Sequence, residues 1–179
     1  MVIRQVPVTL YVLNDAETGE TWVLPDDRDI RDFKRQTEIS MEYADQVEAS
    51  GKKPDKIMAE GIRMDARRRQ FEIDKIAESL PEWRKNADER SFMLIKHSAG
   101  VVEEWEGEAT IMNEDRGTAR LDEQRLMNLM MPASVEGYDK VSLAKLEPEV
   151  KAALWILVRR MTRSDPLRIP LSLRPSGNS

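Results

Sequence analysis

The sequence predicts a mainly α fold of the α+β class, built from an antiparallel helical hairpin, further helices, a small N-terminal β-hairpin and an extended C-terminal arm. Two long segments, 26–50 and 54–80, carry apolar residues at three- and four-residue spacing and are joined by a short link at Gly51. In 6–12 and in 167–173, apolar residues alternate with other residues, which is the period of extended chain. These changes divide the chain into a hairpin over 1–25, a helical domain over 26–165 and an arm over 166–179.

The N-terminal segment is expected to form two strands joined by a polar turn at 14–19. The first strand carries alternating apolar residues, namely Val6, Val8, Leu10 and Val12. Pro7 lacks a backbone N–H donor, which suits an edge position. Two strands alone are marginally stable in water, so this hairpin must be covered by a helix of its own chain or by another molecule, and we favour the second.

The two long segments are predicted to be helices that pack back to back. Acidic residues at the start of the first helix, Gly51 after its end and Pro54 at the start of the second are typical helix boundaries, and Pro81 is expected to stop the second helix. The predicted apolar stripes consist of Ile30, Phe33, Thr37, Met41, Ala44 and Val47, and of Met58, Ile62, Ala66, Ile73, Ile76 and Leu80.

Three more helices are expected in the remaining chain. The first spans 87–98, the second begins at Thr118 and ends at Pro132, and the third begins near Pro148 and is apolar over much of its circumference. Between the first two, 101–113 loses the helical period and is predicted to be extended or a ragged hairpin. We expect the last helix to be the core element.

The composition leaves little for catalysis. Of 179 residues, 33 are acidic and 28 are basic, but His97 is the one histidine and there is no cysteine. Imidazole and thiolate carry most nucleophilic, proton-transfer and zinc chemistry near neutral pH. The sequence contains no phosphate loop, dinucleotide fingerprint or nucleophile elbow. We therefore expect a protein that is not an enzyme, with no catalytic residues, no metal and no cofactor.

An acidic cluster is a candidate partner-binding surface. It consists of Glu103, Glu104, Glu106 and Glu108. These carboxylates could hold Mg²⁺ or Ca²⁺, or supply an acid/base pair for a hydrolase, but a run of like charges is more often a solvated face.

The basic run Arg67–Arg69 is not expected to bind nucleic acid. Three successive helical residues fan over roughly 200° and do not form one phosphate-binding stripe. The net charge of the chain is −5, whereas attraction to phosphate needs a basic face. We therefore expect no nucleic-acid partner.

The C-terminal arm is the second candidate partner-binding surface. Its members are Leu167, Arg168, Ile169, Leu171 and Leu173, with the apolar residues on one edge. Such an edge is buried only by lying on a surface, which is either the arm's own domain or a groove or sheet edge of a partner. Segment 101–123 has eight acidic and two basic residues, a net of −6, and 159–174 has five arginines and one aspartate, a net of +4. Opposite patches of this kind latch within one chain or join subunits.

Long charged helices with a hairpin at one end and an arm at the other favour binding over catalysis. This combination resembles small bacteriophage virion or tail-assembly proteins, which implies a non-catalytic protein–protein interaction subunit of the structural, assembly or adaptor kind. Its partner would be another protein or further copies of the chain. An acidic regulatory or inhibitory protein that docks on a nucleic-acid-binding partner is the alternative, and a carboxylate-dependent hydrolase is third.

The sequence also bounds the location of the protein. No stretch of 18 apolar residues is present, so we expect no membrane association. The absence of cysteine fits a reducing compartment, and Met1–Gln5 lead into no apolar signal segment. We expect an intracellular, cytoplasmic protein, or one that is incorporated into a virion.

Overall fold

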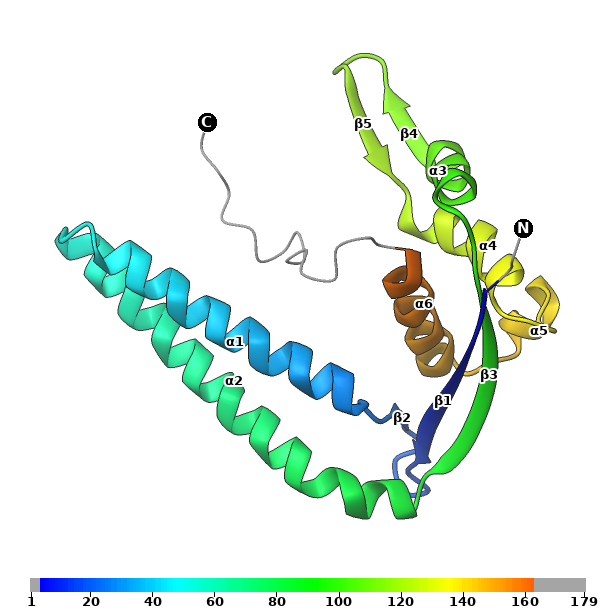
Figure 1. The fold of residues 1–179 in the computed structure, drawn as a ribbon, viewed down its shortest axis with the longest axis horizontal. Helices are drawn as coiled ribbons and strands as arrows, with labels where there is room; N and C mark the ends of the chain where they lie inside the picture. The colour runs from blue at the N-terminus through cyan, green and yellow to red at the C-terminus, as the bar shows by residue number, and fades with distance from the viewer. Residues whose placement is uncertain (1–3, 163–179) are drawn as a thin grey trace. The chain divides into compact units, whose positions relative to one another are not determined.

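The computed structural model describes residues 4–162, and these residues form two compact units (Figure 1). One unit combines 4–23 with 88–162, and the other is the helical hairpin within 24–87. The fold is mainly α, of the α+β class, as predicted. The compact units do not follow the expected division at residue 25, because the N-terminal strands share a core with the chain after residue 88. The arm expected over 166–179 lies outside the described residues.

The helical hairpin is formed by α1 (Asp27–Glu48) and α2 (Lys53–Lys85), which run antiparallel side by side (Figure 1). Asp26 caps α1, since its Oδ1 accepts a 2.7 Å hydrogen bond from the backbone N of Asp29. In the turn, Gly51 adopts φ +74°, a conformation that residues with a Cβ avoid.

Helix α2 does not stop at Pro81, contrary to the sequence-based expectation. Proline removes one helical hydrogen bond, but the last turn is held by contacts that the sequence does not reveal. Leu80 is buried, and the Arg84 guanidinium lies 3.1 Å from the carboxylate of Asp27 at the start of α1.

The seam between α1 and α2 is narrow. Its large buried residues, Ile30, Ile73 and Leu80, form a cluster near the start of α1 and the end of α2. Along the rest of the seam the buried residues are small, namely Thr37, Ala44, Ala59 and Ala66. Met58 and Phe33, expected in the seam, are 51% and 42% exposed. Small residues let the helices approach closely and leave part of the apolar surface of both helices uncovered.

The other unit contains a three-stranded antiparallel sheet in the order β2 (Thr21–Val23), β1 (Arg4–Asn14), β3 (Asp88–Lys96). The N-terminal ribbon is therefore covered by its own chain, and the expectation that another molecule covers it was wrong. Long pairing between β1 and β3, from Arg4 opposite Lys96 to Val12 opposite Asp88, supplies the third strand. Pro7 lies in the stretch of β1 that β2 does not reach.

The strand β3 replaces the helix that was expected over 87–98. Asn86 and Glu89 resemble a helix cap, but the burial has a period of two, with Phe92 and Leu94 buried and Ser91 exposed. Pairing with β1, which is distant in the sequence, decides the conformation of this segment, and a local pattern does not report such pairing.

Two further expectations were wrong in the middle of the chain. Residues within 101–108 are helical, in α3 (Ala99–Glu108), followed by a ribbon of β4 (Thr110–Asn113) and β5 (Thr118–Leu121). The next helix, α4 (Glu123–Ser134), is capped by Asp122 and not by Thr118, and contains Pro132.

The core of this unit lies between one face of the sheet and the helices. A short helix α5 (Lys140–Ala144) leads into α6 (Pro148–Thr162), whose Val150, Leu154 and Val158 are fully buried. The prediction that this last helix is a core element is confirmed. The rest of the core consists of Leu10, Val12, Phe92, Leu94, Val102, Ala109, Leu126, Met130, Met131, Val135 and Leu143.

A paired charge ties the sheet to the start of α6. Both guanidinium nitrogens of Arg90 on β3 bind the Glu147 carboxylate, at 2.7 and 2.8 Å. Hydrogen bonds from Arg90 are the main reason that the pKa of Glu147 falls from its usual 4.5 to about 2. A carboxylate with a lowered pKa in the folded state stabilises the fold above its unfolded pKa.

We predict that Glu147→Gln lowers the free energy of unfolding at pH 7 by on the order of 1 kcal/mol, a value discounted for the partial exposure of the pair. The difference between the two proteins should shrink as the pH falls from about 4.5 towards about 2, because the wild-type carboxyl then becomes neutral. Urea unfolding at several pH values measures this, with Glu104→Gln on exposed surface as the control. An unchanged difference at pH 2 would contradict the assignment.

Candidate functional site

The arm residues proposed as a partner-binding edge, Leu167, Arg168, Ile169, Leu171 and Leu173, lie outside the described residues 4–162. Their role stays a prediction. The acidic candidates lie on α3, which is a helix and not the solvated strand that the sequence suggested.

The four glutamates of α3 have different surroundings. Glu103, Glu104 and Glu108 are exposed and form no ion pair within residues 4–162. Glu106 is half-buried and lies 3.1 Å from the Arg159 guanidinium on α6. The structure therefore separates three exposed carboxylates from one that is part of an internal contact.

Arg159 is the internal partner of the acidic segment. Its side chain is only 12% exposed, reaches Glu106 at 3.1 Å and Glu123 at 3.7 Å, and stacks against Trp155. Through Arg159, the positive segment 159–174 contacts the negative segment 101–123 within one unit. Arg160 of the positive segment also lies in α6, whereas Arg163, Arg168 and Arg174 are outside the described residues.

His97 lies directly after β3 and has a packing role. Its Nε2 lies 2.9 Å from the carbonyl oxygen of Ala133, and its ring meets the edge of Trp105 with the ring centres 4.9 Å apart. These contacts join the end of β3 to α3 and α4. The imidazole of His97 therefore stabilises the packing of these elements.

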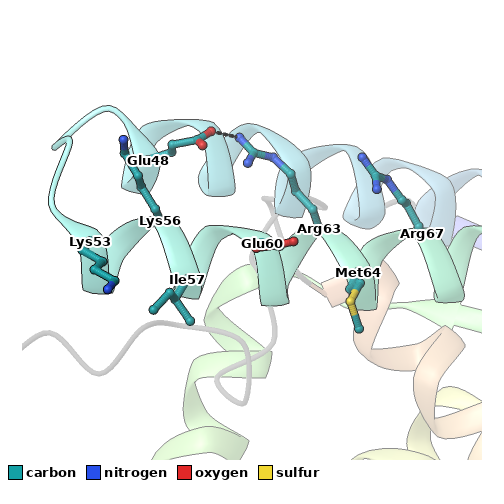
Figure 2. A pocket seen from close by; sticks show the side chains of 8 residues that line it. All are labelled: Glu48, Lys53, Lys56, Ile57, Glu60, Arg63, Met64 and Arg67. Carbon is teal, nitrogen blue, oxygen red and sulfur yellow. Dashed lines mark hydrogen bonds and ion pairs between the residues drawn. The ribbon is translucent and has the colours of Figure 1, made fainter.

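The most exposed apolar side chains of the helical hairpin form one row on α2. Ile57, Met64 and Phe71 are 63%, 68% and 60% exposed and are spaced seven residues apart. Each precedes a seam residue by two positions, which places the row opposite the seam at about 100° per residue. Figure 2 shows Ile57 and Met64 pointing away from α1. We name these three residues the outer row.

A row of charged residues follows one side of the outer row. It consists of Lys53, Glu60, Arg67 and Asp74, again spaced by seven, and we name it the flanking row. Its charges alternate in sign along the helix. Lys53, Glu60 and Arg67 form no ion pair within the described part of the chain, whereas Asp74 lies 3.6 Å from Lys34 and accepts a hydrogen bond from Gln70.

Gly61 lies beside the outer row, in the interior of α2. Glycine in a helix interior costs about 0.5–1 kcal/mol relative to alanine. Its φ is not in the left-handed region, and a Cβ built on it would meet nothing within 4 Å. Nothing within residues 4–162 therefore requires a glycine at this position.

A shallow depression of about 520 Å³ lies near the tip of the hairpin, where Figure 2 shows its lining. Arg63, its partly buried cation, lies 2.6 Å from Asp45 and also binds Glu48, and these carboxylates raise the pKa of Arg63. The guanidinium is thus committed to a contact between α1 and α2. The lining residues are Glu48, Lys53, Lys56, Ile57, Glu60, Arg63, Met64 and Arg67.

The comparisons with known proteins identify no relative. No family model, curated protein or solved structure matches this chain. Within residues 4–162, no three acidic or histidine side chains gather in a way that could hold a metal ion. None of the described helices combines the length and apolarity needed to cross a bilayer. The function must therefore be inferred from the described surfaces.

Sequence reasoning missed the outer row, although the signal was present. Residues 57, 64 and 71 are apolar at a constant spacing of seven. The seam residues 59, 66 and 73 share this spacing, so the sequence alone does not show which set is exposed. Two apolar stripes on opposite faces of one helix are distinguished only when burial by α1 is known.

Because a methyl group at Gly61 meets open space, we predict that Gly61→Ala stabilises the chain by about 0.5–1 kcal/mol. Thermal unfolding followed by circular dichroism at low protein concentration measures this. The matched control is Gly51→Ala, which should destabilise because residue 51 adopts φ +74°. Destabilisation by Gly61→Ala would mean that a close contact exists within the chain.

Proposed function

We propose that this chain is a non-catalytic protein–protein interaction subunit that works in assembly by surface contact. The outer row of α2 is the observation that carries the proposal. Exposed apolar surface costs about 25 cal/mol per Å² relative to burial, and three large apolar side chains exposed in line on one helix face favour an interface. A long ordered helix presents this row without a large loss of entropy on binding.

The composition of the chain and its long charged hairpin also support the proposal. The shortage of imidazole and thiolate favours a binding role over an enzymatic one. An assembly subunit of the small virion or tail-assembly type, present in the cytoplasm and then built into a larger particle, fits the long charged hairpin. In this proposal the partners are proteins, including further copies of the chain.

A second candidate function is docking of the acidic segment on a basic surface, such as that of a nucleic-acid-binding protein. The ribbon β4–β5 exposes Met112 by 66% and Ile111 by 41%. Three exposed glutamates of α3 precede this ribbon in the sequence. Charge that steers association, followed by apolar contact, suits a regulatory partner.

We predict that replacing the outer row, in the triple variant Ile57→Ser, Met64→Ser, Phe71→Ser, reduces the association of the chain. Sedimentation velocity over a range of concentrations should show wild-type species larger than the 20.6 kDa chain, and the variant should need at least about tenfold higher concentration to form them. The matched control replaces Trp22, Val141 and Ile156, which are similarly exposed, with serine.

Strictly monomeric behaviour of the wild-type chain at every concentration, unchanged in the triple variant, would contradict the proposal. Equal loss of association in the control variant would show that general surface apolarity, and not the outer row, drives the contact.

For the second candidate, we predict that Glu103→Gln, Glu104→Gln, Glu108→Gln weakens binding of a fluorescent arginine-rich peptide by roughly tenfold at low salt. Fluorescence anisotropy measures the affinity. The control removes the same charge from α2 by changing Glu72, Glu78 and Glu82, which are also exposed. An equal effect of both variants would mean that only net charge matters and would remove α3 as a docking site.

A further inference from the structure

We propose that the outer row of α2 pairs with the same row of a second copy of this chain, antiparallel and about a two-fold axis at Met64. The inference deepens the proposed assembly function and rests on it, since it names the partner and the register. Three observations support it: the spacing of the apolar residues, the order of the charges and the position of Gly61.

The apolar residues of the outer row are self-complementary when one helix is reversed. With the axis at Met64, Ile57 faces Phe71 of the second copy, Met64 faces Met64 of the second copy, and Phe71 faces Ile57 of the second copy. The row spans 14 residues, roughly 21 Å of helix at 1.5 Å per residue. Seven residues are nearly two helical turns, so the three side chains lie in line along one helix face, at one of the two positions per heptad that are apolar in a coiled coil.

The charges of the flanking row select the antiparallel orientation. In an antiparallel pair, the same side of both helices comes together, so a flanking row faces its own reversed copy. Lys53 then faces Asp74 of the second copy, and Glu60 faces Arg67 of the second copy. The two-fold axis repeats both contacts, which gives four pairs of opposite charge and none of like charge.

A parallel pair lacks this complementarity. The flanking row would then face the row on the other side of Ile57, Met64 and Phe71, which consists of Pro54, Gly61, Arg68 and Lys75. Arg67 would then lie beside Arg68 of the second copy and Glu60 beside Gly61, which leaves Asp74 beside Lys75 as the one pair of opposite charge between these rows. Like charges at an interface act against the wrong orientation.

The side chains required for these contacts are available in the isolated chain. Glu60 and Arg67 form no ion pair within residues 4–162, and Arg67 is exposed. Asp74 is 52% exposed, and its contact with Lys34 at 3.6 Å is a surface contact worth little free energy. Lys75, whose Nζ lies 4.4 Å from the centre of the Phe71 ring, covers the end of the row.

Gly61 makes room for the second copy on the side of the outer row that lies opposite the flanking row. In the antiparallel register, Gly61 faces Arg68 of the second copy, whose side chain is 72% exposed. Without a Cβ at residue 61, the long arginine stem lies across the helix backbone, so the helices approach closely. This contact accounts for a helix-interior glycine that no contact within the described part of the chain requires.

Other occupants fit the face less well. A membrane surface selects a helix with a uniformly basic polar side, whereas the flanking row alternates in sign. A nucleic acid would meet Glu60 and Asp74 beside the apolar row, and carboxylates repel phosphates.

The test exchanges charges at one predicted pair. Glu60→Arg places a new arginine opposite Arg67 of the second copy, and Arg67→Glu places a new glutamate opposite Glu60 of the second copy. Each single variant should therefore dimerise at least roughly tenfold more weakly than wild type. The double variant restores opposite charges and should dimerise like wild type. An equimolar mixture of the two single variants should form a heterodimer, measured by sedimentation velocity and native mass spectrometry.

The outcomes separate this inference from the broader proposal. Weak singles with a rescued double variant and mixture support the antiparallel contact. If the wild type associates but the single variants associate equally well, the α2 contact is overturned while an assembly function through another surface stands. A wild-type chain that never associates overturns both. At about 1 M salt the differences between variants should largely disappear, because the Debye length falls to about 3 Å.

A cysteine experiment tests the register separately, since the chain contains no cysteine of its own. Met64→Cys lies on the two-fold axis and should form a disulfide-linked dimer under mild oxidation, whereas Ile57→Cys should not. A mixture of Ile57→Cys and Phe71→Cys should form the mixed disulfide. Equal self-crosslinking of Met64→Cys and Ile57→Cys would indicate parallel helices and overturn the proposal.

Discussion

Helix α2 carries apolar residues on two opposite faces, while α1 covers only one of them. The second apolar face is therefore exposed on the hairpin. The seam face is closed by small residues such as Ala59 and Ala66, so little apolar surface is buried over most of the hairpin. The outer row of Ile57, Met64 and Phe71 remains exposed on an ordered helix. In the proposed assembly a second copy of the chain buries this row, and the alternating charges beside it select the antiparallel orientation.

The unit formed by 4–23 and 88–162 is organised differently. Pairing of β1 with β3 brings distant parts of the chain together, and α4 and α6 cover one face of the sheet with fully buried side chains such as Leu126 and Leu154. Arg90 with Glu147, and Arg159 with Glu106, fix helices to this framework through charged contacts. Arg90 and Arg159 therefore serve the fold of this unit, whereas Glu103, Glu104 and Glu108 form no ion pair within residues 4–162.

The sequence predicted the elements whose signals are local. Both long helices and the last helix have strong apolar periods and boundary residues such as Asp26 and Gly51, and the structure confirms them. The segment around Phe92 was mistaken for a helix because strand pairing with β1 leaves no local mark. The outer row was missed for a related reason, since the exposure of Met64 depends on which face α1 occupies. The acidic residues were identified, but only the structure separates Glu106 from the exposed glutamates.

The sharpest test of the antiparallel contact is an isotope-filtered nuclear Overhauser experiment on a mixture of labelled and unlabelled chains. Ile57 and Phe71 lie roughly 21 Å apart along one helix, so magnetisation transfer between the Ile57 methyl groups and the Phe71 ring must pass between two copies. We expect this cross-peak at concentrations where the chain associates. Associated chains without it, or with transfer only between Ile57 and Ile57 of another copy, would contradict the antiparallel contact.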